Sequence, residues 1–390
     1  MNRFLLPLTL LLTLSAPPPA AASQAAAQDD TNLARAKAVL ERTPLIDGHN
    51  DLPWAIRNFE QAPHDVLAYD ITRRAPGHTD LARLRQGMVG AQFWSVYIPA
   101  DLDEADFVRV QLEQIDIARQ VIAAYPDHLE LAGTADDIER IFGEGKIASL
   151  LGVEGGHAIA NSLGALRVYY DLGARYMTLT HSLTIDWADS ATDDPLHDGL
   201  TAFGEEVVRE MNRMGMLVDM SHISPATMND VLDVAEAAVI FSHSSARGLV
   251  DHPRNVPDQV LRRLPANGGV VMVTFVPRFL AEDGNATLAS AADHIEHVRN
   301  VAGIDHVGIG GDYDGIDKGP VGLEDVSTYP ALFAELATRG FSDEDLAKVA
   351  GENLLRVLRG AEVTADQLQS ERAPSTATIE ALDGTGEEED

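Results

Sequence analysis

The stretch TPLIDGHNDLP, residues 43–53, joins a short apolar run directly to a histidine and an aspartate. A dinucleotide-binding fold would carry a glycine-rich loop after its first strand, and no such loop stands here. Residues two positions apart in an extended segment point to the same side, so His49 and Asp51 can bind one cation. The H-x-D triplet alone is common, and a turn-capping Asp51 beside a solvated His49 is the plain alternative. The position directly after a predicted strand favours a metal site.

Short apolar runs continue along the chain and alternate with segments of helical pattern. Strands are predicted at Pro44–Asp47, Val89–Val96, Ala148–Val153, Tyr176–Leu179, Met216–Asp219, Ala238–Phe241, Gly269–Val273 and Val307–Gly310. Helices are predicted at Asp103–Ala124, Leu163–Leu172, Thr201–Met214, Ser224–Ala235, Pro257–Arg263, Ala289–Ala302, Tyr329–Arg339 and Asp343–Leu358. The alternation predicts a parallel α/β fold, and eight repeats favour a closed (β/α)8 TIM barrel over an open doubly wound sheet.

Polar residues follow several of these runs: Glu154 in LGVEGGH, His222 in LVDMSH, His243 in VIFSH and Asp312 in VGIGGD. The carboxyl ends of barrel strands meet at one mouth, so these side chains are expected to lie close to His49 and Asp51. Imidazole and carboxylate groups are zinc ligands. We therefore predict a metal site at the C-terminal mouth of the barrel.

Each of these residues also has a structural alternative. Glu154 has two oxygens that can bridge two metal ions, but a strand-end glutamate can equally pair with an arginine. His222 and His243 could each be a buried, hydrogen-bonded structural histidine. His157 is predicted either to support a ligand from behind or to be structural. No lysine ends a predicted strand, so a modified lysine is not expected to bridge metals. Glu154 is the predicted bridge if two ions are bound.

Three residues suggest catalysis or substrate contact. Asp312 can accept a proton and return it to a leaving amine, although Asp314 and Asp317 compete for that role. His181, in TLTH after the fourth predicted strand, could donate to a developing oxyanion or be structural. Arg254, in HPRNVPD, could hold a substrate carboxylate or form a surface salt bridge.

Composition narrows the class of partner. The chain has 390 residues, 29 Lys and Arg against 61 Asp and Glu, and a net charge of −32. Such a surface repels nucleic acid and anionic membranes, although most of the charge simply favours solubility. There are no cysteines, which excludes disulfides, a Cys-ligated zinc site and a thiol nucleophile.

The two ends of the sequence differ from its body. Residues 1–27 carry Arg3, an apolar run and small residues, which predicts a cleaved secretory signal and a spacer. An uncleaved anchor is less favoured because the run falls short of the ~20 residues that span a bilayer. No cysteine follows for a lipid anchor, and no GPI signal ends the chain. We expect an exported, periplasmic or secreted protein with a catalytic barrel at 31–360. The acidic tail at 361–390 is expected to be largely disordered, although its start could pack against the body.

Eight motifs stand in one order along the chain: DGHNDLPW, GVEGGH, TLTHS, FSHSSA, RNVPD, GGDYDG, GLEDVSTYP and ENLLRV. Together they resemble the renal (membrane) dipeptidase family, the dinuclear zinc dipeptidases of the amidohydrolase superfamily. The similarity runs from about Leu45 to Val357. It implies a (β/α)8 barrel with two zinc ions per chain, a small dipeptide substrate and a homodimer.

The resemblance also implies residue roles. His49 and Asp51 would hold one zinc ion and His222 and His243 the other, with Glu154 bridging them. The peptide bond would be attacked by a metal-bridging hydroxide, and dipeptides with a D-residue at the C-terminal position would be among the substrates.

Three more roles follow from the same resemblance. Asp312 would act as proton shuttle, His181 as oxyanion donor, and Arg254 as the group that binds the terminal carboxylate. Asp312, His181 and Glu154 would thus be catalytic, and His181, Arg254 and Asp312 would contact substrate.

One segment departs from the family pattern. Where mammalian members carry an aromatic-rich stretch, this chain reads TFVPRFL, and Phe279 replaces a tyrosine. Side-chain preference and β-lactam activity therefore stay open. A lactonase or N-acyl-amino-acid hydrolase on the same site, or a barrel that binds metal or peptide without turnover, are the alternative functions.

Overall fold

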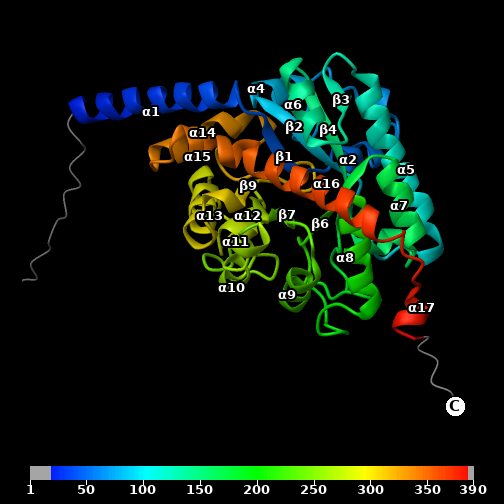
Figure 1. Ribbon diagram of the computed structural model, residues 1–390. Coiled ribbons are helices and arrows are strands. Elements are labelled where there is room, and N and C mark those ends of the chain that lie inside the picture. Colours follow the sequence, from blue (N-terminus) through cyan, green and yellow to red (C-terminus); the bar gives the residue numbers. More distant parts are fainter. Residues whose placement is uncertain (1–18, 385–390) are drawn as a thin grey trace, which may run out of the picture.

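A closed barrel of parallel strands forms the centre of the protein in this computed structural model, which describes residues 19–384 (Figure 1). The barrel strands are β1 (Leu45–Asn50), β2 (Val89–Ser95), β4 (Ile147–Glu154), β5 (Ala174–Thr178), β6 (Leu217–Asp219), β7 (Ile240–Ser244), β8 (Val270–Val273) and β9 (Val307–Ile309). Neighbouring strands pair in parallel, and the pairing of β2 with β4 closes the ring. The predicted TIM barrel is confirmed.

One strand was not predicted. β3 (Leu129–Leu131) pairs with the first residues of β4, where Leu129 lies opposite Ile147. β5 takes over this edge of β4 only from Leu151 onward. A three-residue strand carries too little periodic pattern to be recognised in the sequence.

Helices surround the barrel (Figure 1). They are α1 (Pro19–Leu40), α2 (Leu52–Arg57), α3 (Val66–Tyr69), α4 (Leu81–Gln86), α5 (Glu104–Ala124), α6 (Ala135–Gly143), α7 (Leu163–Asp171), α8 (Ala202–Met214), α9 (Pro225–Val234), α10 (Asp258–Leu261), α11 (Leu264–Asn267), α12 (Pro277–Leu280), α13 (Leu288–Ala302), α14 (Tyr329–Thr338), α15 (Asp343–Ala347), α16 (Asn353–Glu371) and α17 (Ile379–Leu382). Thr201 and Ser224 show why the predicted helices begin where they do, since each side chain accepts a backbone N–H of the first turn.

Short helical turns complete the chain. Three are 3-10 turns, η1 (Gly156–Ile159), η2 (Ile304–His306) and η3 (Val326–Thr328), and η4 (Lys348–Glu352) is a π-helical segment. η4 interrupts the single helix that was predicted over Asp343–Leu358.

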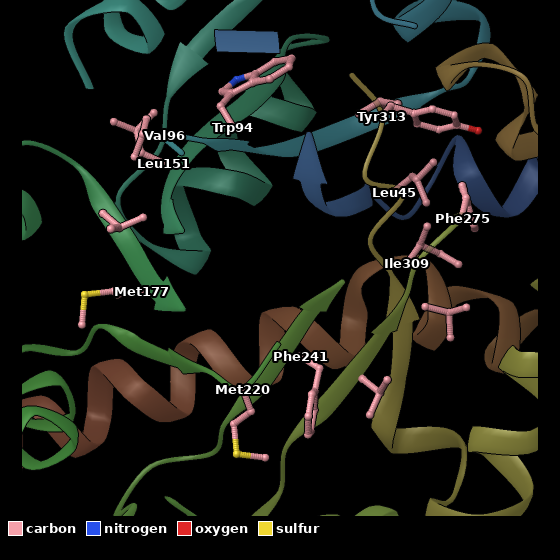
Figure 2. Packing of buried hydrophobic residues seen from close by; sticks show 14 of the residues in the cluster. Leu45, Trp94, Val96, Leu151, Met177, Met220, Phe241, Phe275, Ile309 and Tyr313 are labelled. Carbon is pink, nitrogen blue, oxygen red and sulfur yellow. The ribbon is translucent and has the colours of Figure 1, made fainter. Parts of the chain in front are cut away.

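Two apolar layers hold the barrel. Outward-facing strand residues such as Leu151 and Phe241 belong to one cluster that also contains helix residues. Figure 2 shows part of this cluster around the strands. Inward-facing residues such as Leu150 form a second cluster, which also contains Leu354 and Leu358 of α16. Leu150 and Leu151 fall in different clusters because successive strand residues point to opposite faces. The barrel interior is therefore a packed core, and the polar site is confined to its mouth.

The C-terminal segment differs from expectation. Residues after 360 were predicted to be largely disordered, with only their start able to pack against the body. That start is a continuation of α16 to Glu371, which buries Ala361, Ala365 and Leu368. Gln369 also donates a hydrogen bond to the carbonyl of Arg213, at 3.0 Å. Three small or apolar residues at helical spacing suffice to attach this helix to the body, a pattern that the polar composition obscured.

The N-terminal prediction lies partly outside the described residues. Residues 1–18 of the predicted signal are not described, and α1 begins at Pro19. Near its C-terminal end, α1 is attached to the body where Arg35 donates to the carbonyl of Phe341 at 2.8 Å. None of the helices among residues 19–384 combines the length and the apolar character that a membrane span requires.

Candidate metal centre at the barrel mouth

The carboxyl ends of five strands bring the predicted residues together. His49 lies near the end of β1, Glu154 is the last residue of β4, and His243 lies in β7. Asp51 follows β1, His222 follows β6 and Asp312 follows β9. These six side chains lie close together at the mouth of the barrel, as predicted.

Glu154 occupies the centre of this group. Its Oε2 lies 3.3 Å from Nε2 of His49, while its Oε1 lies 3.1 Å from Nε2 of His222 and 3.3 Å from Nε2 of His243. One carboxylate oxygen thus faces His49, and the other faces His222 and His243. This arrangement allows one carboxylate to contact two cations.

Three groups of ligand atoms are compact enough to hold an ion. They are His49, Glu154 and His243; Glu154, His181 and His222; and His49, Asp51 and Asp312. These groups do not coincide with the two predicted pairs, His49 with Asp51 and His222 with His243. They also place His181 and Asp312 within reach of a cation. The shared members show that the mouth is one continuous cluster of ligand atoms.

The cluster suits a metal better than it suits hydrogen bonding. Nε2 of His49 is buried and forms no hydrogen bond of acceptable geometry, although Oδ2 of Asp51 lies only 3.3 Å away. A buried nitrogen of this kind is costly unless a ligand satisfies it. Imidazole nitrogens and carboxylate oxygens are a donor set typical of zinc.

Hydrogen bonds behind the cluster orient two of the imidazoles. Nδ1 of His243 lies 2.8 Å from Oγ of Ser242, whose hydroxyl donates to Asp219 at 2.6 Å. Nδ1 of His49 lies 2.8 Å from the hydroxyl of Tyr176, which donates to the carbonyl of Gly48. Because each hydroxyl donates elsewhere, it can accept from Nδ1–H, and Nε2 is the nitrogen directed toward the cluster.

Two residues of the cluster have an unusual backbone. His222 has φ of 70° and Asp312 has φ of 62°, in the left-handed region that non-glycine residues rarely adopt. Such strain persists only where the surrounding structure imposes it, and it concentrates at functional sites. The chain therefore turns sharply at both residues to aim their side chains at the mouth.

Burial and mutual charge shift the pKa values of the cluster. Burial lowers the pKa of His222 and of His243 well below the usual value, which favours the neutral imidazole that metals bind. Burial alone would raise the pKa of Glu154, but charged His49 and hydrogen bonds from His222 and His243 lower it well below normal. Neutral His222 and His243 and an ionised Glu154 are the forms that bind a cation. His49 differs: although burial opposes it, Tyr176, Glu154 and Asp51 raise its pKa well above the usual value, so it would release a proton on binding a cation.

Whereas the pKa of Glu154 is lowered, that of Asp312 is raised. Burial raises its pKa well above the usual value, and the nearby charges of Asp51 and Glu154 add to this effect. A raised pKa makes the Asp312 carboxylate a stronger base than an exposed aspartate, which suits it to proton transfer.

The cluster forms the floor of a cavity of about 590 Å³. His181 and Arg254 line it, as predicted, together with residues that the sequence did not single out: Trp54, Tyr97, His252, Val276, Arg278 and Ile316. Arg254 is buried, and its guanidinium donates to the carbonyl of His243 at 3.1 Å. It is therefore not the surface salt bridge that was the alternative.

Other predicted residues lie elsewhere. Asp314 accepts from the backbone N–H of His78 at 2.6 Å, and both Asp314 and Asp317 line a different cavity, so neither competes with Asp312. His157 contacts the carbonyl of Ile98 at 3.1 Å and belongs to none of the compact groups of ligand atoms.

The supporting residues Asp47 and Asp219 were missed. Asp47 accepts from the backbone N–H groups of His49 and Gly311, and Asp219 from those of Ser221 and Ser242. Each aspartate stands two or three residues before a histidine of the cluster in an otherwise apolar run, a signal that was available in the sequence.

The barrel and its ligand cluster place the chain in the class of TIM-barrel metallohydrolases. A profile of the membrane dipeptidase family, peptidase family M19, matches residues 33–372. The chain belongs to this family, and the predicted resemblance is confirmed.

Individual relatives agree with the family. Dipeptidase 3 of Mus musculus is 48% identical over 334 residues, which cover 84% of this chain and 66% of the mouse protein. Dipeptidase verJ of Clonostachys rogersoniana is 47% identical over 344 residues, covering 85% of this chain and 88% of that protein.

A solved structure agrees as well. A metallo peptidase from Rhodobacter sphaeroides, liganded with a phosphinate mimic of the dipeptide L-Ala-D-Ala, superposes with a TM-score of 0.74 at 25% identity. The superposition covers 82% of this chain and 99% of that one.

Proposed function

We propose that this protein is a zinc dipeptidase that hydrolyses the peptide bond of dipeptides. The observation that carries the proposal is the position of Glu154, whose two oxygens face His49 on one side and His222 and His243 on the other. A site that spans two cations is suited to hydrolysis of an amide, and a merely structural metal would not need an open cavity beside it.

The metal ligands in this proposal are five residues: His49, Asp51, Glu154, His222 and His243. Two zinc ions bound there would lower the pKa of a water molecule and polarise the peptide carbonyl. The protein contributes the fixed orientation of its imidazoles, which Tyr176 and Ser242 hold from behind.

Asp312 and His181 would serve proton transfer and charge stabilisation. Asp312 shares the mouth with His49 and Asp51, so its carboxylate is close enough to accept a proton at the floor of the cavity and carry it to the leaving amine. Nε2 of His181 lies 3.8 Å from Oε1 of Glu154. An imidazole N–H there would donate to the oxygen of the attacked carbonyl.

Arg254 would bind the terminal carboxylate of the substrate. Burial lowers its pKa to about 10, so the guanidinium stays charged at neutral pH. A buried cation next to the ligand cluster is stabilised by an anionic group of the substrate, and it selects short substrates because a longer peptide has no carboxylate at that distance. We include dipeptides with a C-terminal D-residue, as the mimic bound by the Rhodobacter sphaeroides relative suggests.

The test combines metal analysis with a substrate panel. Protein purified without chelator should contain about two zinc ions per chain. It should hydrolyse alanyl-alanine with either an L- or a D-residue at the C-terminus, and leave N-acetylalanine and simple lactones intact. Turnover of only the N-acyl amino acid or the lactones would replace the dipeptidase proposal with the alternative hydrolase.

We further propose that the protein is exported through the predicted signal at residues 1–27, and that it forms a homodimer. N-terminal sequencing of protein recovered from the periplasm or medium tests the first point. Light scattering of the purified protein tests the second.

A further inference from the structure

Arg278 is the exposed cation at the rim of the substrate cavity. It lies in α12, on the TFVPRFL segment that departs from the family pattern, and it lines the same cavity as Arg254. Among the described residues, no carboxylate oxygen lies within 4.0 Å of its guanidinium, whereas most arginines of this acidic protein are paired. Arg278 is therefore available to bind an anionic group that enters the cavity.

Phe279 holds Arg254 and Arg278 near one another. The guanidinium carbon of each lies 5.5 Å from the centre of the Phe279 ring, so the two carbons are separated by no more than twice that distance. Arginine pairs with carboxylate through N–H···O bonds of about 2.8 Å. In aspartate and glutamate only two or three carbon atoms separate the two carboxyl groups, so one such residue can reach both arginines.

His252 packs on the same ring without competing as a cation. Its ring centre lies 4.3 Å from that of Phe279. Burial, and then the charges of Arg278 and Arg254, lower its pKa to about 4, so it is neutral at pH 7. The positive charge on this wall of the cavity thus comes from the two arginines.

We infer that Arg278 selects dipeptides whose C-terminal residue is acidic, by pairing with the side-chain carboxylate while Arg254 holds the terminal one. The inference rests on the proposed dipeptidase function and names its substrate class. Arg278 is a specificity residue here. It takes no part in the bond-breaking step, which occurs at the floor of the cavity.

The test compares isosteric substrates in the zinc-loaded enzyme. Alanyl-glutamate should have a kcat/KM about tenfold above that of alanyl-glutamine, because one charge-assisted pair is gained. Arg278→Gln should abolish this ratio, mainly through KM, and Arg278→Lys should retain part of it. Arg278→Glu should invert the preference toward alanyl-lysine.

Arg262→Gln is the matched control, since Arg262 is an exposed arginine at the end of α10 that does not line the cavity. It should keep the wild-type ratio. Equal kcat/KM for the two substrates in the wild type, or the same ratio in Arg278→Gln, would overturn the inference while alanyl-alanine hydrolysis still supported the dipeptidase. Failure to hydrolyse alanyl-alanine as well would overturn both.

Discussion

Inside the barrel, the ring of Tyr176 fills the space that a side chain on Gly152 would need. A Cβ atom on Gly152 would lie 2.0 Å from Cζ of the Tyr176 ring, so only glycine admits the phenol at this position. The hydroxyl of Tyr176 then lies 2.8 Å from Nδ1 of His49. A glycine on β4 thereby fixes the orientation of His49, a proposed metal ligand on β1, through a tyrosine on β5.

Tyr176→Phe removes the acceptor of the His49 Nδ1–H and should weaken zinc binding by roughly 10–100-fold, as is typical when an outer partner of a ligand is lost. Competition with a chromogenic chelator measures this affinity. Tyr169→Phe is the control, because its buried hydroxyl donates to the carbonyl of Ala158 and does not contact a ligand. Equal zinc affinity in the two variants would contradict the role of Tyr176.

Gly152→Ala should displace the Tyr176 ring. We expect a loss of about 1–3 kcal/mol in the free energy of unfolding, as for other overpacked cores, together with weaker zinc binding. Chemical denaturation of the zinc-free protein measures the first effect. In Gly143→Ala the new methyl would meet no atom within 4 Å, and stability should stay the same or rise slightly. If both substitutions behave alike, the close packing of Gly152 on Tyr176 has no energetic consequence.

Asp312→Asn should retain zinc and lower kcat by roughly 10²–10⁴-fold, because an amide cannot carry the proton to the leaving amine. Metal analysis and steady-state kinetics on alanyl-alanine separate the two effects. Asp317→Asn, which alters an exposed carboxylate lining another cavity, should leave kcat unchanged. Full activity of Asp312→Asn would disprove its role as proton carrier.

Leu368→Ala tests the helix that replaces the expected disordered tail. Leu368 is 4% exposed, and its truncation should lower the free energy of unfolding by about 2–3 kcal/mol. Val363, on the same helix, is 68% exposed, and Val363→Ala should change stability by less than about 0.5 kcal/mol. Thermal unfolding of the two variants should differ accordingly; coincident curves would mean that α16 does not pack here in solution.

Much of the site could be predicted because its chemistry follows strand ends. His49, Glu154 and His243 each stand at or near the end of an apolar run, and parallel strands in a barrel bring such positions to one mouth. Asp47 and Asp219 were overlooked because each was read as part of a strand, although a carboxylate in such a run requires buried donors. Two features could not be predicted: which ligand atoms group together at the mouth, and the cavity wall that contains Arg278 and Phe279. Both depend on how side chains from distant loops are oriented toward one another.

The sequence by itself determined the barrel, the residues proposed to bind metal and the family, because apolar runs, helical periodicity and the motifs at strand ends are local properties. The tertiary structure alone decided which oxygen of Glu154 faces which histidine, that Tyr176 reaches His49 past Gly152, and that Arg254 and Arg278 share one aromatic ring. These relationships join residues far apart in the chain. Their distances are set by the closure of the barrel and the packing of its interior, which no local pattern encodes.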